Sequence, residues 1–282
     1  EGAIKLAKRV TKRYEIISAK ESYHGSTQGS LSVLGIESQK KAYRPLIPFT
    51  KLIEYNNEND INKITDKTAA VILETIQGGA GFILPKNNYL RKVKSRCEEV
   101  GALLILDEIQ TGFGRTGKFF GFELFNVNPD IIVLGKAMGG GLPIAGFISS
   151  KKFMRKFESN PMLGHITTFG GNPISAAAGL ATVKEILNSD LMSKIPKKEE
   201  IFRKNLIHPK IVKIQGTGLM LAPILKNNEE ARKLIYKCLE KGLLLFWLLW
   251  EKKAVRISPP LTISENEIVK GCKIICQSLD EI

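Results

Sequence analysis

Short apolar runs that end abruptly in polar or glycine residues mark the first part of the chain. The run at 102–106 is followed at once by Asp107, and the run at 131–134 is followed, after one glycine, by Lys136. Such runs are typical of strands buried on both faces, as in a parallel sheet. The segment between them is long enough for the crossover that joins parallel neighbours. We therefore expect an acid and an amine at neighbouring strand ends, where open α/β sheets bind ligands.

The remaining pattern predicts the elements around this pair. Helices are expected over 1–13, 87–100 and 174–187 and from about 151 and 264, and strands near 15–18, 69–73, 144–148, 211–214, 219–225, 243–250 and 254–257. The run at 243–250 is the longest apolar one, and we interpret it as an interior strand. The fold class is α/β, a mostly parallel central sheet with flanking helices over 1–186, followed by a smaller α+β domain over 187–282.

The composition argues against nucleic-acid binding, membrane association and a metal site. The 282 residues carry a formal charge of +14, but the lysines are spread along the chain and no nucleic-acid recognition motif accompanies them, so we expect a solvated basic surface and no nucleic-acid partner. No apolar run approaches the ~20 residues that span a bilayer, so we expect no membrane association. The cysteines lack metal-site spacing, which favours buried thiols in a reducing, cytoplasmic compartment and no metal: Cys97, Cys238, Cys272 and Cys276.

A lysine and an aspartate at adjacent strand ends match what pyridoxal 5'-phosphate requires. A lysine among glycines behind an apolar strand can be partly desolvated, which lowers its pKa and makes its amine a Schiff-base nucleophile. An aspartate keeps the pyridine nitrogen protonated, so that the ring accepts electrons. The plainer alternatives are a solvated loop lysine for Lys136, and a helix N-cap or structural ion pair for Asp107.

Six motifs, in the same order along the chain, resemble those of class III aminotransferases, which are pyridoxal-phosphate enzymes of fold type I. The motifs are YHG at 23–25, ETIQG at 74–78, LDEIQTGFGRTG at 106–117, LGKAMGGGLP at 134–143, TFGGNP at 168–173 and RISPPL at 256–261. The resemblance covers essentially the whole chain, and six ordered motifs are far more specific than one glycine-rich loop.

The resemblance implies roles in cofactor binding. Lys136 would form the internal aldimine and then move the proton between the substrate α-carbon and C4′, while Asp107 would pair with the pyridinium nitrogen. Gln110 would hydrogen-bond near the ring hydroxyl, and Tyr23 would stack on the ring face. His24 is assigned to the same cofactor-binding group, where it helps to shape the loop.

Three further residues are implied in substrate binding and assembly. Thr168 would reach the phosphate of the neighbouring subunit's cofactor, which implies a homodimer. Arg256 would bind the substrate carboxylate through a two-pronged contact, and Glu74 is a supporting candidate beside the substrate. The plainer alternatives are core packing for Tyr23, a turn cap for Gln110, a helix N-cap for Thr168 and a surface position for Arg256.

Three departures from the family pattern stand out. The family's main phosphate-binding turn should precede Glu1, so we expect the sequence to be part of a longer chain and to retain cofactor weakly by itself. Gly79 stands where ornithine-type members commonly carry a glutamate that can pair with the carboxylate-binding arginine. Without that acid Arg256 would stay free, which weakens an expectation of strict ornithine specificity. Thr75 replaces a frequent proline.

We therefore expect a pyridoxal-phosphate-dependent aminotransferase of the acetylornithine/ornithine type. It would move the terminal amino group of N-acetylornithine or ornithine to 2-oxoglutarate. Alternatives on the same scaffold are a 4-aminobutyrate or lysine transaminase and a glutamate-1-semialdehyde mutase. A non-catalytic truncated paralogue is the alternative from another class, and nucleic-acid binding is a distant third.

Overall fold

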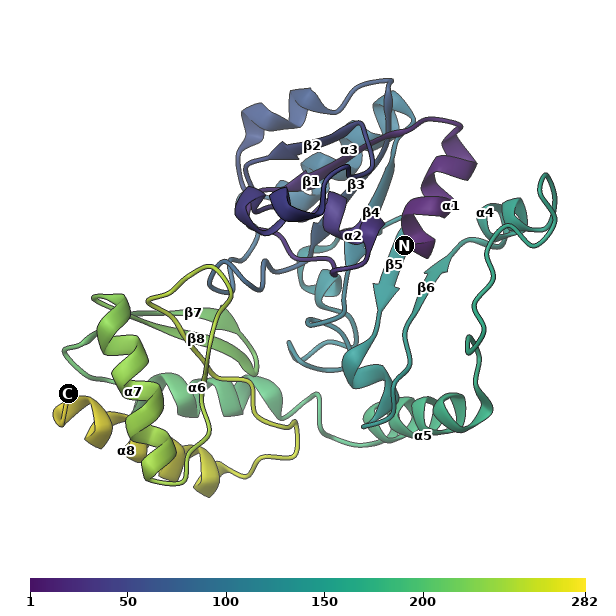
Figure 1. Cartoon of the computed structure of the whole chain (residues 1–282). Coiled ribbons are helices and arrows are strands. Elements are labelled where there is room, and N and C mark those ends of the chain that lie inside the picture. Colours follow the sequence, from purple (N-terminus) through teal and green to yellow (C-terminus); the bar gives the residue numbers. More distant parts are fainter. The chain divides into compact units, whose positions relative to one another are not determined.

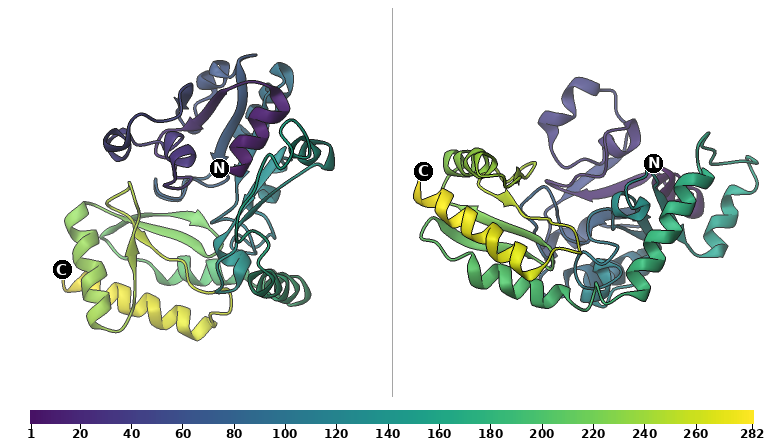
Figure 2. Two further views of the ribbon diagram at one scale, coloured as in Figure 1. Left: turned by 45° about the vertical axis from the view of Figure 1, so that its right-hand side comes forward. Right: turned by 90° about the horizontal axis from the view of Figure 1, so that it is seen from below.

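The computed structural model describes residues 1–282, which form two compact units (Figure 1, Figure 2). The first unit comprises Glu1–Thr75, Pro85–Gly112 and Phe122–Glu185, and the second comprises Ile76–Leu84, Phe113–Gly121 and Ile186–Ile282. The sequence suggests a single cut after residue 186. In the structure two loops from the earlier part of the chain also belong to the second unit.

The first unit is built on a six-stranded sheet in the order β2-β1-β3-β4-β5-β6. All neighbours are parallel except β6, which runs antiparallel to β5. The expected mostly parallel sheet is confirmed. The strands are β1 (Glu15–Ala19), β2 (Thr50–Ile53), β3 (Thr68–Glu74), β4 (Leu103–Asp107), β5 (Ile131–Leu134) and β6 (Gly146–Ser149).

Helices cover both faces of this sheet, with α1 (Gly2–Thr11) on one face and α3 (Tyr89–Val100) on the other (Figure 1). In β4, Leu104 and Leu106 belong to the core under α3, and Ile105 belongs to the core under α1. Because alternate residues of the strand meet a helix on either side, the strand is a continuous apolar run rather than an alternating one.

The remaining helical segments up to α5 are short, apart from α5 itself, whose last residues belong to the second unit. They are α2 (Gln28–Ser32), α4 (Lys151–Met154), α5 (Pro173–Asn188) and the 3-10 turns η1 (Glu37–Gln39), η2 (Lys41–Tyr43), η3 (Glu58–Lys63), η4 (Gly121–Phe125), η5 (Lys136–Gly139) and η6 (Arg155–Phe157). The long connection between β4 and β5 contains no α-helix, only the turn η4.

The second unit is α+β, as expected. Two antiparallel pairs, β7 (Ile211–Thr217) with β8 (Met220–Leu225) and β9 (Phe246–Trp247) with β10 (Val255–Arg256), pack with three helices. The helices are α6 (Ile195–Asn205), α7 (Asn228–Glu240) and α8 (Glu265–Asp280). Their shared core is apolar and includes Phe202, Leu221, Leu234, Ile268 and Cys272.

The expected interior strand over 243–250 is wrong. Only Phe246 and Trp247 are extended, and their strand partner is β10. Leu245 and Leu248 are buried, whereas Leu244 is 79% and Leu249 is 52% exposed. An apolar run by itself does not show how many neighbouring strands will pair with it. Here two residues of the run form one strand of a two-stranded ribbon.

The buried thiols are confirmed for three of the four cysteines, Cys97, Cys238 and Cys272, while Cys276 is half-buried. Burial raises the pKa of the Cys97 thiol to about 12 and that of Cys272 to about 12, so both stay protonated at neutral pH. None of the helices combines the length and the apolar content needed to span a lipid bilayer.

Stability of the first unit depends on the packing of β4. Leu106 is fully buried directly before Asp107. We expect Leu106→Ala to lower the free energy of unfolding by about 2–5 kcal/mol, because it leaves a cavity under α3. Leu124→Ala is the control, since that leucine is 37% exposed. Urea unfolding followed by circular dichroism measures both, and equal losses would contradict the assignment of Leu106 to the core.

Candidate active site

Three neighbouring strands of the first unit end at the same edge of the sheet. The register pairs Glu74 of β3 with Asp107 of β4, and Asp107 with Val133 of β5. Lys136 lies two residues beyond the end of β5. The expected adjacency of the two strands that carry the acid and the lysine is therefore confirmed.

The Asp107 carboxylate is buried and held from two sides. Its Oδ2 lies 2.9 Å from Nδ1 of His24, and its Oδ1 accepts a hydrogen bond from the Ile109 N–H at 3.0 Å. Its side chain is 6% exposed. An ionised carboxylate offers about four acceptor positions, so two contacts leave capacity for a further N–H donor. No helix begins at this turn, so the N-cap alternative for Asp107 does not hold.

A loop behind β1 brings His24 to this carboxylate. The Tyr23 N–H donates to Glu74 Oε1 at 3.0 Å, so the buried acid at the end of β3 fixes the loop that carries Tyr23 and His24. The His24 side chain is 2% exposed, and its Nε2 is buried without a hydrogen-bond partner. A buried nitrogen without a hydrogen-bond partner costs folding free energy. Unpaired polar atoms of this kind are often found where a protein binds a ligand.

A second buried carboxylate lies one residue beyond Asp107. Glu108 accepts hydrogen bonds from Thr75 Oγ1 at 2.5 Å, from Thr111 Oγ1 at 2.7 Å and from the Phe122 N–H at 2.9 Å. Sequence reasoning missed this cluster. The signal was the acid directly behind Asp107, together with the threonine in place of a proline at position 75. The cluster ties the end of β3 to the turn that follows β4.

Lys136 is exposed at the end of β5, so the chain itself does not supply the partial desolvation that the sequence suggests. The backbone of Lys136 has φ 47°, in the left-handed region that non-glycine residues rarely adopt. Strain of this kind, about 1–3 kcal/mol, persists only where the surroundings enforce it and is frequent at functional sites. The lysine therefore occupies a specifically enforced turn.

Two other candidates of the first unit lie in turns. Gln110 is half-buried in the turn behind Asp107, and Thr168 is exposed in the turn before α5. The N-cap alternative for Thr168 does not hold, because Asn172 caps that helix: its Oδ1 accepts hydrogen bonds from the N–H groups of Ile174 and Ser175.

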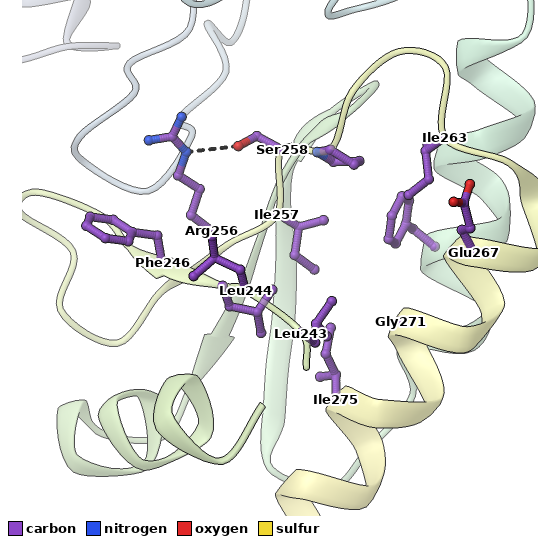
Figure 3. Close-up of a pocket in the computed structure, with 13 residues that line it drawn as sticks. Leu243, Leu244, Phe246, Arg256, Ile257, Ser258, Ile263, Glu267, Gly271 and Ile275 are labelled. Atoms are coloured by element: carbon purple, nitrogen blue, oxygen red, sulfur yellow. Dashed lines mark hydrogen bonds between the residues drawn. The ribbon is translucent and has the colours of Figure 1, made fainter. Parts of the chain in front are cut away.

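Arg256 belongs to the second unit. It is half-buried on β10, and its Nε–H donates to Ser258 Oγ at 3.0 Å. Desolvation lowers the pKa of its guanidinium, which is therefore no ordinary surface arginine. The residue lies at the rim of an apolar pocket of about 300 Å³, with its guanidinium directed away from Leu243 and Ile275 (Figure 3).

A second arginine of the same unit was missed by sequence reasoning. Arg115 donates from one guanidinium nitrogen to the carbonyls of Leu219, at 3.2 Å, and Pro259, at 2.5 Å. Desolvation, and after it the positive charge of Arg256, lowers the pKa of Arg115 to about 10. Both guanidinium groups thus stay charged at neutral pH and create a positive potential in this part of the second unit.

Comparison with known proteins agrees with the motifs and the fold. The family model for class III aminotransferases matches residues 1–279. The chain belongs to the class III aminotransferases. It is similar to an acetylornithine aminotransferase of Caldanaerobacter subterraneus, at 39% identity over 100% of this chain and 73% of the relative. It is also similar to a putrescine aminotransferase of Pectobacterium atrosepticum, at 37% identity over 99% of this chain and 64% of the relative.

Solved structures of this class have the same fold. An ornithine aminotransferase of Toxoplasma gondii, with partial occupancy of pyridoxal phosphate at its active site, superposes with a TM-score of 0.91 at 27% identity, over 100% of this chain and 69% of that one. A Bacillus anthracis aminotransferase superposes with a TM-score of 0.90 at 27% identity, over 99% of this chain and 73% of that one. This class III aminotransferase is therefore an enzyme of a family that depends on pyridoxal phosphate.

The Glu108 cluster yields a direct test. We expect Thr75→Val, which keeps the shape of the side chain but removes the hydroxyl donor, to lower the free energy of unfolding by about 1.5–3 kcal/mol. Thr75→Ser keeps the hydroxyl and should cost about 1 kcal/mol for the lost methyl group. Chemical denaturation compares the two. A valine variant no less stable than the serine variant would show that the hydroxyl does not support Glu108.

Proposed function

We propose that this class III aminotransferase binds pyridoxal 5'-phosphate and transfers the terminal amino group of N-acetylornithine or ornithine to 2-oxoglutarate. The observation that carries the cofactor assignment is the buried Asp107 carboxylate, which has acceptor capacity left beside the unpartnered His24 Nε2. The similarity to an acetylornithine aminotransferase supports the choice of donor.

The residues at the strand ends fit this cofactor. When bound, pyridoxal phosphate supplies a reactive aldehyde and a ring that accepts electrons. Asp107 would accept a hydrogen bond from the protonated ring nitrogen, and a buried carboxylate stabilises that proton more strongly than one in water. His24 holds Asp107 in place, while Gln110 and Tyr23 are proposed to contact the ring.

Lys136 is the proposed catalytic base. Its amine stands at the end of β5, next to the strand that ends in Asp107. In its neutral form it would take a proton from the substrate carbon that bears the amino group and deliver it to the cofactor carbon. The enforced turn at Lys136 fixes the direction in which its side chain leaves the backbone.

Arg256 is proposed to bind a substrate carboxylate, with Glu74 as a supporting residue that holds the Tyr23 loop. A guanidinium matches a carboxylate through two parallel hydrogen bonds, which a lysine cannot provide. A diamine donor is the second candidate, favoured by the similarity to a putrescine aminotransferase. A diamine has no carboxylate for Arg256, so donor preference separates the two candidates.

A homodimer is proposed as the active assembly, with Thr168 reaching the cofactor phosphate of the neighbouring subunit. The segment that carries Thr168 is unusually apolar for an exposed surface. Its exposed side chains are Ile166 at 68%, Phe169 at 83%, Ile174 at 71% and Leu180 at 56%. A second copy of this chain would cover such a surface, since soluble monomers rarely leave large apolar patches open.

Lys136 provides the test of the reaction. Addition of pyridoxal phosphate should produce an absorbance band near the visible edge that bleaches with N-acetylornithine and yields glutamate from 2-oxoglutarate. We expect Lys136→Ala to lack this band, because no other amine stands at the end of β5. Lys151→Ala, at the exposed start of α4, is the control. The absence of any Lys136-dependent band would contradict the proposal and leave a non-catalytic paralogue.

The dimer has a separate test. We expect Leu180→Glu to shift the sedimenting species from dimer to monomer, because a charge on this surface must be desolvated in the interface. Leu239→Glu, on α7, is a matched control with a side chain that is 53% exposed. A wild-type chain that sediments as a monomer, or equal behaviour of both variants, would argue against this interface.

A further inference from the structure

Gly79 lies directly under the indole ring of Trp250. A β-carbon on Gly79 would come within 2.7 Å of Trp250 Nε1 and 2.8 Å of Cδ1, distances that real side chains do not tolerate. The backbone N–H groups of Trp250, at 2.9 Å, and of Glu251, at 3.2 Å, both donate to the Gly79 carbonyl, so the two loops are joined at this point. Both residues belong to the second unit.

The backbone itself does not demand glycine at this position. Gly79 is not among the glycines with positive φ, in contrast to Gly81 in the same loop, which has φ 115°. An L-residue could therefore adopt the conformation of residue 79. What excludes a side chain is the space that the indole fills, so the identities of residues 79 and 250 depend on each other.

The indole nitrogen lacks a hydrogen-bond acceptor. Trp250 Nε1 is buried and has no partner. An indole N–H can only donate, and a buried donor left unpaired costs about 1–3 kcal/mol. The neighbouring Glu251 carboxylate does not reach this nitrogen, and its Oε1 accepts a hydrogen bond from the Lys253 N–H at 3.1 Å. An oxygen supplied by a ligand would complete this donor.

We propose that Trp250 is a substrate-specificity residue whose indole N–H donates to a carboxylate or acyl oxygen of the substrate. Together with Arg256 it selects compounds that carry such an oxygen at the end remote from the reacting amine, against diamines. This inference rests on the proposed function, because it assigns the substrate class of the same enzyme.

The charges of the second unit support this selection. Arg256 and Arg115 can only donate hydrogen bonds, and both are cations. Gly79 supplies no acid, and Glu267, the acid that lines the pocket with Arg256, is engaged by Ser264 in the cap of α8. A substrate carboxylate would find hydrogen-bond donors at Arg256 and Trp250, which a second ammonium could not use.

The two tryptophans allow a test that does not need the reaction. In Trp247→Phe, Trp250 is the sole tryptophan. In the chain without pyridoxal phosphate we expect its emission to be that of a half-buried indole and to change saturably with glutarate, a dicarboxylate that cannot react. 1,4-Diaminobutane should cause no change. Trp250→Phe, in which only the exposed Trp247 emits, is the matched control and should not respond to glutarate.

Substitution at Gly79 tests the coupling of the two residues. In the Trp247→Phe background, Gly79→Ala should shift the emission of Trp250 towards that of an exposed indole and weaken glutarate binding. If Gly79→Glu fails to fold, the alanine variant still decides the outcome. An emission unaffected by Gly79→Ala, or an equal response to glutarate and 1,4-diaminobutane, would overturn the proposal.

Kinetics then connect the residue to turnover. Loss of one hydrogen bond to a charged group corresponds to about a ten- to hundred-fold effect, so Trp250→Phe should lower kcat/KM for 2-oxoglutarate by that factor. The Lys136-dependent absorbance band should persist in this variant. A missing band in the wild type would refute the proposed function, whereas an intact band with unchanged kcat/KM would refute only the role of Trp250.

Discussion

The structure of the candidate site depends on two consecutive carboxylates, Asp107 and Glu108, that are buried at the end of β4. A buried charge without partners costs several kcal/mol, so each carboxylate requires donors that are fixed in place. Asp107 obtains them from His24 and from its own turn, and Glu108 from Thr75, Thr111 and the Phe122 N–H. The loops around the site are therefore held by these two acids.

The order of the strands explains why such distant segments meet. Because β1, β3, β4 and β5 are parallel, their carboxyl ends open on one edge, and each loop that leaves them passes the same place. Glu74 at the end of β3 holds the Tyr23 loop through a backbone N–H, and that loop in turn presents His24 to Asp107. The end of β3 thus positions the loop after β1, and that loop positions the side chain that contacts the end of β4.

Much of this arrangement could be predicted from the sequence, because buried strands and their ends leave a clear pattern. The runs before Asp107 and Lys136 identified two neighbouring parallel strands. The pattern failed where burial depends on neighbouring elements. The apolar run 243–250 predicts an interior strand, but only Phe246 and Trp247 form a strand, in a two-stranded ribbon. Strand β2 was missed because its residues are partly exposed. The partners of Glu108 were not predictable, because hydroxyl donors from separate loops carry no periodic signal.

Gly79 shows how far a motif can be transferred residue by residue. Considered alone, the glycine indicates only that an acid is missing beside Arg256. In the structure, the indole ring of Trp250, from the loop between β9 and β10, fills the space beside Gly79 and brings an unpaired N–H there. Under the proposed role of Trp250, a substrate would meet a hydrogen-bond donor at this place and not an acceptor. The choice of amino donor that we propose therefore rests on a pair of positions that are close in space but distant in sequence.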